Sequence, residues 1–397
     1  MADPGPLAVR RLRHDEVTTA LERSLASFGA HQDPARAERS LRRRVERGQV
    51  LAAAERSTDR VLAHASAATL DHWLGGRRVC CQHVTGVAVA PEDRGRGAAT
   101  ALLRAIARTG AQAGAGLSLL FPSVDSLYRR LGWEHAGDYA RWRLACRAAA
   151  GVDGPPLRRL QPERDWPAVR ACHRRFGAAN PALAVRDEDR WAQLGEARFG
   201  WVREVAEDRV DAYVLLDHEP KPDDWRHRLA VRDWAAISPE GLTALVALVG
   251  RHGTTAADAT LRGAIPHPFQ LVLPEQELAL DDHVQWMARG LDLSAAVAAR
   301  GFPMPVCLDV IVEIDDEGLG DRGDTWRLTV EGGRGALRPS DERPTARLAA
   351  TAVGPLLTGH RSGSQLALAG HADGDESTLA ALSAAFSGPR PHLTDFF

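Results

Sequence analysis

The feature that most constrains the fold of this 397-residue chain is a strand that leads through a glycine-rich turn into a helix. The strand pattern spans residues 78–89, the turn reads Arg94-Gly95-Arg96-Gly97, and an amphipathic helix is predicted at about residues 98–114. This arrangement directs free backbone N–H groups and the positive end of the helix dipole at one point. Glycine lets the backbone approach a ligand closely, and Arg94 and Arg96 would add positive charge. The segment therefore predicts a phosphate-binding site.

The turn differs from two other phosphate-binding turns. It lacks the Gly-Lys-Ser/Thr ending of a P-loop and does not match the Gly-x-Gly-x-x-Gly pattern of dinucleotide-binding folds. Instead, Val-x-Val-x-Pro at residues 87–91 and Arg-x-x-Gly-x-Ala at residues 94–99 resemble the acetyl-CoA signature of the GCN5-related N-acetyltransferases (GNATs). The alternative is an ordinary glycine-rich turn, but the order of the surrounding elements favours the resemblance.

The GNAT resemblance implies a set of residues that bind acetyl-CoA. The strand residues Val87, Ala88 and Val89 would bind the pantetheine arm and the acyl carbonyl. The pyrophosphate would be bound by the turn and the first turn of the helix, namely Arg94, Gly95, Arg96, Gly97, Ala98, Ala99 and Thr100. Ser123 and Val124 complete the predicted coenzyme-binding set, at the start of the short helix expected after the next strand.

A tyrosine follows in this short helix. Tyr128-Arg-Arg-Leu-Gly-Trp133 resembles a GNAT pattern of an aromatic residue, two further residues, a hydrophobic residue, glycine and an aromatic residue. When an amine attacks a thioester, coenzyme A leaves as a thiolate that needs a proton. A phenol with a pKa near 10 can supply that proton. Tyr128 is therefore the predicted general acid; the alternative is a tyrosine that only packs beside the coenzyme.

The length and the element pattern predict an α/β (α+β) protein of three domains. Residues 1–147 form the first, and a linker rich in Gly and Pro at 148–157 opens the second, residues 148–286. The order of the expected elements appears twice. In the first domain we expect helices at 16–26, 34–47, 98–114 and 124–131 and strands at 50–55, 60–69, 78–89, 117–121 and 139–144. In the second domain we expect helices at 163–176 and 239–252 and strands at 200–205, 211–216, 229–236 and 271–273. In the second copy, residues 231–241 have no Arg-x-x-Gly-x-Gly/Ala pattern to supply the glycines and cations that a pyrophosphate needs, which predicts a copy that does not bind coenzyme.

The last part, residues 287–397, is predicted as a smaller α+β domain. Its expected elements are helices at 291–300, 353–357 and 377–386 and strands at 305–314 and 325–330. Residues 287–302 and 354–359 and the terminal Phe396-Phe397 resemble the enhanced intracellular survival (Eis) acetyltransferases. This resemblance implies two tandem GNAT-like domains followed by a sterol carrier protein-like domain.

The Eis resemblance also implies an activity and an assembly. Members of that family acetylate amino groups of aminoglycosides and lysine side chains, and they assemble as hexamers. Their general base is the carboxylate of the last residue, here Phe397. A terminal carboxylate has an intrinsic pKa of about 3.5, so it needs burial and a nearby ammonium group to act at neutral pH. The alternative is a tail whose aromatic rings only pack.

Several other classes are disfavoured by composition. The net charge of −2 shows no basic excess, which argues against a nucleic-acid partner. No apolar run is long enough to span a membrane and no signal peptide is evident, so we expect a cytoplasmic protein. Five scattered cysteines predict neither disulfides nor zinc. No metal is expected, because His64, His72 and His83 are spaced too irregularly for a ligand set and are more typical of solvated or hydrogen-bonded residues.

The acceptor amine stays open. The loop at residues 26–33 corresponds to the amine pocket of the Eis family, and its acidic content is Asp33 alone, with Phe28 as its aromatic candidate. A polyamine favours several acidic groups, so acetylation of aminoglycosides is less secure than acetylation of amines in general. The alternatives are an acetyltransferase for protein lysines or small metabolites, and a non-catalytic scaffold that binds coenzyme A.

Overall fold

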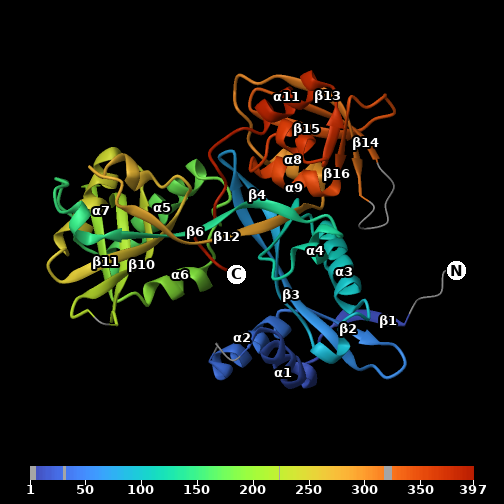
Figure 1. The fold of residues 1–397 in the computed structure, drawn as a ribbon, viewed down its shortest axis with the longest axis horizontal. Helices are drawn as coiled ribbons and strands as arrows, with labels where there is room; N and C mark the ends of the chain where they lie inside the picture. The colour runs from blue at the N-terminus through green and yellow to red at the C-terminus, as the bar shows by residue number, and fades with distance from the viewer. Residues whose placement is uncertain (1–5, 30–32, 223, 317–323) are drawn as a thin grey trace.

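The computed structural model describes residues 6–29, 33–222, 224–316 and 324–397, which form three lobes (Figure 1). The first lobe contains β1 (Leu7–Arg11), α1 (Val17–Phe28), α2 (Pro34–Glu46), β2 (Val50–Glu55), β3 (Val61–Leu74), β4 (Arg77–Val89), α3 (Ala98–Gln112), β5 (Leu117–Leu120), α4 (Asp125–Arg129) and β6 (Glu134–Ala145). The second contains β7 (Arg158–Arg159), α5 (Pro162–Ala179), α6 (Glu188–Gly195), β8 (Phe199–Ala206), β9 (Arg209–Glu219), β10 (His227–Ala236), α7 (Pro239–Arg251), β11 (Ala256–Gly263) and β12 (Leu278–Gly290).

The third lobe is a separate α+β unit. It contains α8 (Leu293–Ala299), β13 (Leu308–Asp315), β14 (Asp324–Glu331), β15 (Arg334–Pro339), β16 (Ala346–Ala349), α9 (Ala350–Thr358), α10 (Gly363–Leu368), β17 (Ala372–Gly374) and α11 (Glu376–Ala385). Its five strands are ordered β15-β14-β13-β16-β17, and Leu356, Leu382 and Phe386 from the helices pack on this sheet. The predicted third domain of mixed helices and strands is confirmed.

The first two lobes share one twelve-stranded sheet, ordered β1-β2-β3-β4-β5-β12-β6-β11-β10-β9-β8-β7. Two long strands join its halves, and Figure 1 shows them running side by side. The end of β12 pairs with β5, from Met287↔Leu120 to Gly290↔Leu117, and therefore completes the sheet of the first lobe. The end of β6 pairs with β11 of the second lobe. Each lobe thus contributes a strand to the other, and β12 crosses position 286/287, where the sequence analysis places a domain boundary.

Most predicted elements are present, with boundaries moved by a few residues, and β2 occupies the expected residues 50–55. The prediction of a strand at residues 271–273 is wrong. Pro268 starts a 3-10 helix over Pro268–Leu271, and the strand in this part of the chain is β11. β11 reads Ala-Ala-Asp-Ala-Thr-Leu-Arg-Gly, whose small and polar residues conceal it, although Ala259 and Leu261 are buried in the sheet. Among the described residues, no helix is long and apolar enough to span a membrane.

Candidate active site

β4 and β5 separate at the predicted coenzyme strand. Their parallel pairing runs from Cys81↔Leu117 to Val84↔Leu120, where β5 ends. β4 continues to Val89, and Gly86 has a φ of +64° where its register with β3 shifts. A bulge of this kind bends a strand away from its neighbour. The backbone of Val87, Ala88 and Val89 therefore has no β5 partner, and an extended pantetheine arm could pair with this free edge.

The glycine-rich turn leads directly from this edge into α3. Gly95 and Gly97 have φ values of +78° and +80°, which side chains other than glycine rarely adopt. A Cβ atom added at either glycine would meet no atom within 4 Å, so the surface above the turn is open. Gly97 is the N-cap of the 15-residue helix α3 and makes no side-chain cap hydrogen bond. The first backbone N–H groups of α3 are therefore available to an anion, as the sequence predicts for Ala98, Ala99 and Thr100.

The two arginines of the turn differ in their surroundings. Arg96 lies 2.5 Å from Glu55 and 3.1 Å from Asp93, so carboxylates offset its charge. Arg60 contacts Asp93 as well, at 2.7 Å. Arg94 is exposed at the turn. Arg94 is therefore the better placed of the two predicted cations to attract a phosphate, and Arg96 serves to fix the turn.

Tyr128 lies on α4 with only 4% of its surface exposed, packed in the core of the first lobe. Burial raises the pKa of its phenol, and a hydrogen bond from the Ser123 side chain opposes that rise. The phenol is therefore protonated at neutral pH and can act as an acid. Val124, the N-cap of α4, is 55% exposed and holds no side-chain cap bond.

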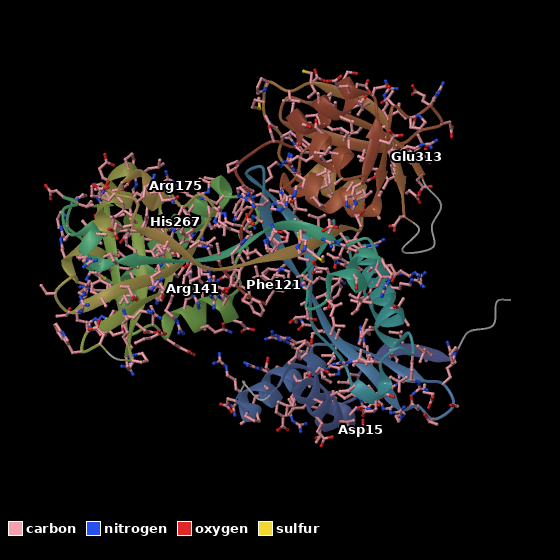
Figure 2. All side chains as sticks on the ribbon, viewed as in Figure 1. Asp15, Phe121, Arg141, Arg175, His267 and Glu313 are labelled. Atoms are coloured by element: carbon pink, nitrogen blue, oxygen red, sulfur yellow. The ribbon has the colours of Figure 1, made fainter. Side chains whose placement is uncertain are left out.

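The last residues of the chain lie against the point where β4 and β5 separate. The Phe397 ring stacks on the His83 imidazole of β4 with centroids 3.7 Å apart, and it lies 5.2 Å from the Phe121 ring, just after β5. Phe396 stacks on Phe121 at 4.5 Å. Figure 2 shows Phe121 near the centre of the molecule, where the lobes meet. Phe397 therefore packs on His83 and Phe121, which flank the point where β4 and β5 separate. The sequence analysis did not assign either residue to the site.

His83 is held by a second histidine. Its Nε2 lies 2.6 Å from Nε2 of His72, whose Nδ1 lies 2.7 Å from the carbonyl oxygen of Ala182. A carbonyl only accepts, so Nδ1 of His72 carries a proton and, between neutral rings, His83 donates to His72. Burial lowers the pKa of both, which keeps both rings neutral. His64 contacts Ser24 at 3.0 Å, so the prediction of hydrogen-bonded histidines is confirmed.

The second lobe anchors the tail. Asp395 accepts hydrogen bonds from Arg186 at 2.8 Å and from Arg190 at 2.8 Å. Arg186 is buried and also donates to Asp233 at 2.6 and 2.8 Å, and Asp233 accepts from the Tyr213 hydroxyl at 2.6 Å. Burial raises the pKa of Asp395, but the two arginines dominate and hold it well below its usual range. The tail is thus fixed by a buried, charged network two residues before Phe397.

Among its described residues, the second lobe has no turn comparable to residues 90–97. Only Ile237 and Ser238 separate β10 from α7, whereas eight residues, 90–97, separate β4 from α3. Ser238 caps its own helix, because its Oγ accepts from the N–H of Gly241 at 2.9 Å, and Pro239 supplies no N–H. The N–H group of Gly241 at the start of α7 is therefore already bonded within the chain, which leaves fewer N–H groups for an anion than at the start of α3.

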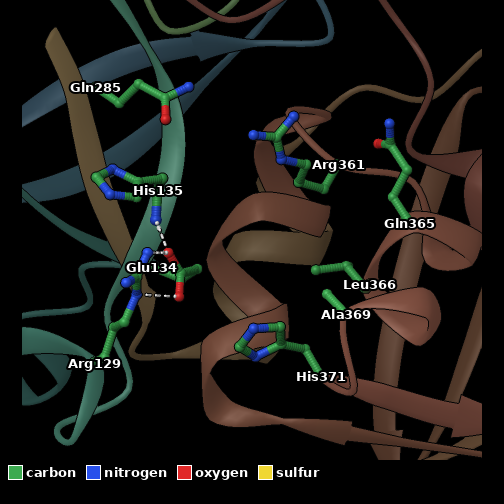
Figure 3. Close-up of a pocket in the computed structure, with 9 residues that line it drawn as sticks. All are labelled: Arg129, Glu134, His135, Gln285, Arg361, Gln365, Leu366, Ala369 and His371. Atoms are coloured by element: carbon green, nitrogen blue, oxygen red, sulfur yellow. Dashed lines mark hydrogen bonds and ion pairs between the residues drawn. The ribbon is translucent and has the colours of Figure 1, made fainter. Parts of the chain in front are cut away.

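A separate cavity of about 650 Å³ lies between β6 and the third lobe (Figure 3). Arg129, Glu134 and His135 line it from the first lobe, and Arg361 and His371 from the third. Arg129 is neutralised by Glu134 at 2.8 Å. The cavity contains none of the predicted site residues.

Family models match all three parts of the chain. An acetyltransferase (GNAT) domain matches residues 8–136, a second acetyltransferase (GNAT) domain matches residues 182–290, and a sterol carrier protein domain matches residues 293–394. The predicted order of two GNAT domains and a sterol carrier protein-like domain is confirmed. The chain is an N-acetyltransferase, its fold implies acetyl-CoA as co-substrate, and GNAT enzymes act on amine acceptors.

Individual relatives agree with this class. An N-acetyltransferase of Streptomyces griseus, described as uncharacterized, is 24% identical over 363 residues, which cover 82% of this chain and 83% of that protein. A GCN5-related N-acetyltransferase of Kribbella flavida is 28% identical, with a TM-score of 0.85 and 98% of each chain covered. Eis1 of Mycobacterium abscessus is 21% identical, with a TM-score of 0.80, over 98% of this chain and 100% of that chain.

Proposed function

We propose that this chain is an Eis-type N-acetyltransferase that transfers the acetyl group of acetyl-CoA to a primary amine, with one coenzyme per chain. The observation that carries the proposal is the position of the tail, because Phe397 stacks on His83 of β4, next to the last pair of β4 with β5 and four residues before the coenzyme strand at Val87. The sequence resemblance to the Eis family and the fold shared with Eis1 support it further. Under this proposal, residues 148–286 form a GNAT copy without a coenzyme site. The resemblance to the Eis family also implies that the protein is a homohexamer and is located in the cytoplasm.

The proposed chemistry uses two groups of the chain. The carboxylate of Phe397 takes a proton from the incoming ammonium group, and the free amine attacks the thioester carbonyl carbon. The C–N bond forms, the C–S bond breaks, and Tyr128 gives its proton to the departing thiolate. The nitrogen loses its second proton as the amide forms; this proton passes through solvent to the Tyr128 phenolate, and the carboxyl group of Phe397 releases its proton to solvent, so both groups are restored. Burial, which raises the pKa of Tyr128, keeps it protonated until that step.

The charges beside the tail and before the glycine-rich turn bear on the choice of acceptor. Asp395 is neutralised by Arg186 and Arg190, and Asp93 by Arg60 and Arg96. A polycationic aminoglycoside gains most from unpaired carboxylates. These pairs therefore favour an acceptor with few positive charges, such as a protein lysine or a small metabolite amine, over an aminoglycoside. Asp33 remains a predicted acidic residue of the acceptor pocket, while Ala30, His31 and Gln32 lie outside the described residues.

Two experiments test the proposal. Release of coenzyme A thiol is measured with acetyl-CoA and a panel of aminoglycosides, lysine peptides and small amines; no release with any amine, despite coenzyme binding, would leave only the scaffold alternative. In the second, two glycines are appended after Phe397, which displaces the terminal carboxylate and leaves the coenzyme edge intact. We expect turnover to fall at least 100-fold with unchanged acetyl-CoA affinity. Undiminished turnover would exclude the carboxylate as the base.

A further inference from the structure

Three histidines of the second lobe lie together and have no part in the proposed reaction. His218 is near the end of β9, His227 begins β10, and His252 is the C-cap of α7. One ring nitrogen from each lies within 4.8 Å of the other two. The fold therefore collects three potential metal ligands from three different elements.

Two ring nitrogens of this cluster are buried without a partner among the described residues. Nε2 of His218 and Nε2 of His227 are buried, and neither has a hydrogen-bond partner among the described residues. A buried polar atom without a partner is energetically unfavourable, and a bound metal ion would remove that cost. Burial lowers the pKa of both His218 and His252, so these rings are neutral at pH 7, the form that binds metals.

The spacing is close to that of a metal site. For three atoms no more than 4.8 Å apart, a central point lies within about 2.8 Å of each, so roughly 0.7 Å of inward movement gives the ~2.1 Å of a Zn–N bond. The His218 and His227 rings stack with centroids 4.1 Å apart, and His252 stands edge-on to His218 at 5.9 Å. Small rotations of these half-buried rings would supply that movement.

The surroundings predict which ions bind and how tightly. Arg159 lies over the ring of Trp201 at 4.4 Å and over that of Phe199 at 5.2 Å, and these aromatic rings contact His252 and His218. Its charge helps to lower the pKa of His218 and His252 and would also oppose a bound cation. Imidazole ligands without a carboxylate suit zinc, nickel, cobalt and copper and exclude magnesium and calcium.

We propose that His218, His227 and His252 bind one divalent transition-metal ion. Three protein ligands leave the fourth tetrahedral position to water. The ion would connect the hairpin between β9 and β10 to the end of α7, and so stabilise the second lobe without entering the acetyl-transfer site.

The test uses the full-length chain without a histidine tag. Equilibrium dialysis against Zn²⁺ should give one ion per chain, and Zn²⁺ should raise the melting temperature. His218→Asn combined with His227→Asn should weaken binding at least 100-fold and abolish the thermal shift. The matched control is His14→Asn, which removes an exposed histidine of the first lobe and should leave binding unchanged. Arg159→Gln should bind Zn²⁺ more tightly than the wild type, because it removes the opposing charge.

The proposal is wrong if the wild type binds no ion at tens of micromolar Zn²⁺, or if the double variant binds as well as the wild type. Circular dichroism checks that the double variant is folded. If it is not, Co²⁺ added to the wild type and to His252→Gln decides the question, since a histidine-bound Co²⁺ has a characteristic visible absorption. Absence of that absorption in the wild type, or its persistence in His252→Gln, would equally overturn the proposal.

Discussion

The strongest test of the tail's role is Asp395→Asn, which removes a charge and preserves shape. Asp395 accepts hydrogen bonds from Arg186 and Arg190 within a buried network. Hydrogen bonds between charged groups contribute about 1.5–3 kcal/mol each, and an asparagine oxygen retains part of them. Because Asp233 still balances Arg186, we expect a loss near 3 kcal/mol rather than the full cost of an unpaired buried charge. That loss is roughly a 150-fold shift in the docking equilibrium of the last residues.

The assay separates docking from coenzyme binding. We expect kcat to fall about 10- to 100-fold, because the stacking of Phe396 and Phe397 retains part of the docking energy. Acetyl-CoA affinity should be unchanged, since the hydrogen-bond partners of Asp395 are Arg186 and Arg190 of the second lobe. Carboxypeptidase A should remove the terminal phenylalanines faster from the variant, which reports undocking independently of activity. The matched control is Asp309→Asn, which breaks the exposed pair with Arg327 at 2.8 Å and should alter neither readout.

Wild-type kcat in Asp395→Asn, together with wild-type resistance to carboxypeptidase, would refute the anchoring role. Faster digestion with unchanged kcat would instead show that the tail docks as described but supplies no catalytic group. Arg190→Gln offers a milder variant, because Arg190 is 32% exposed and Arg186 would still hold Asp395. Its effect on both readouts should lie between those of the wild type and Asp395→Asn.

Three further results are expected. Tyr128→Phe should lower kcat about 100- to 1000-fold with little change in acetyl-CoA affinity, and an unchanged kcat in steady-state assays would leave Tyr128 a packing residue. Gly97→Ala, at a φ of +80°, should destabilise the fold by about 1–2 kcal/mol and weaken acetyl-CoA binding about tenfold by calorimetry; unchanged affinity would contradict a role for the turn. His64, His173 and His392 have pKa values lowered by burial to about 4, so the unfolded state binds more protons below pH 6.5. The free energy of unfolding should therefore fall between pH 6.5 and 4, by roughly 2 kcal/mol per histidine at pH 5, and a flat urea-unfolding profile would contradict this.

The sequence predicts best what depends on neighbouring residues. The strand, the turn and α3 are contiguous, and the positive φ values of Gly95 and Gly97 follow from a turn that only glycine adopts easily. The open strand edge, the glycine turn and the helix were therefore predictable, and so was the absence of a similar turn before α7. The ion pair between Arg96 and Glu55 could not be predicted from the sequence, because Glu55 lies 41 residues earlier and contacts Arg96 only in the folded protein.

Contacts between distant segments escaped the sequence analysis for the same reason. Arg186 and Asp395 are 209 residues apart, and nothing in either local sequence marks them as partners. His83 could be recognised as a hydrogen-bonded histidine, but its stacking on Phe397 depends on how the tail crosses three lobes. β12 was missed because its first half, Leu-Ala-Leu-Asp-Asp-His-Val, lacks a regular alternation of apolar and polar residues and is mostly exposed, while residues 286–289 are fully buried.

The position of β12 also explains why the second lobe persists without a phosphate turn. The end of β12 lies between β5 and β6, so the first lobe has no complete sheet of its own, and Trp286 and Met287 are fully buried there. A fragment of residues 1–147 would expose the edge of β5 and the apolar surface that β12 covers, so we expect it to aggregate or unfold without cooperativity. Residues 1–290 retain β12 and should fold and bind acetyl-CoA by calorimetry, but without the tail they should not turn over. If residues 1–147 alone fold cooperatively and bind acetyl-CoA as tightly as the whole chain, the exchanged strand is dispensable and the second lobe needs another explanation.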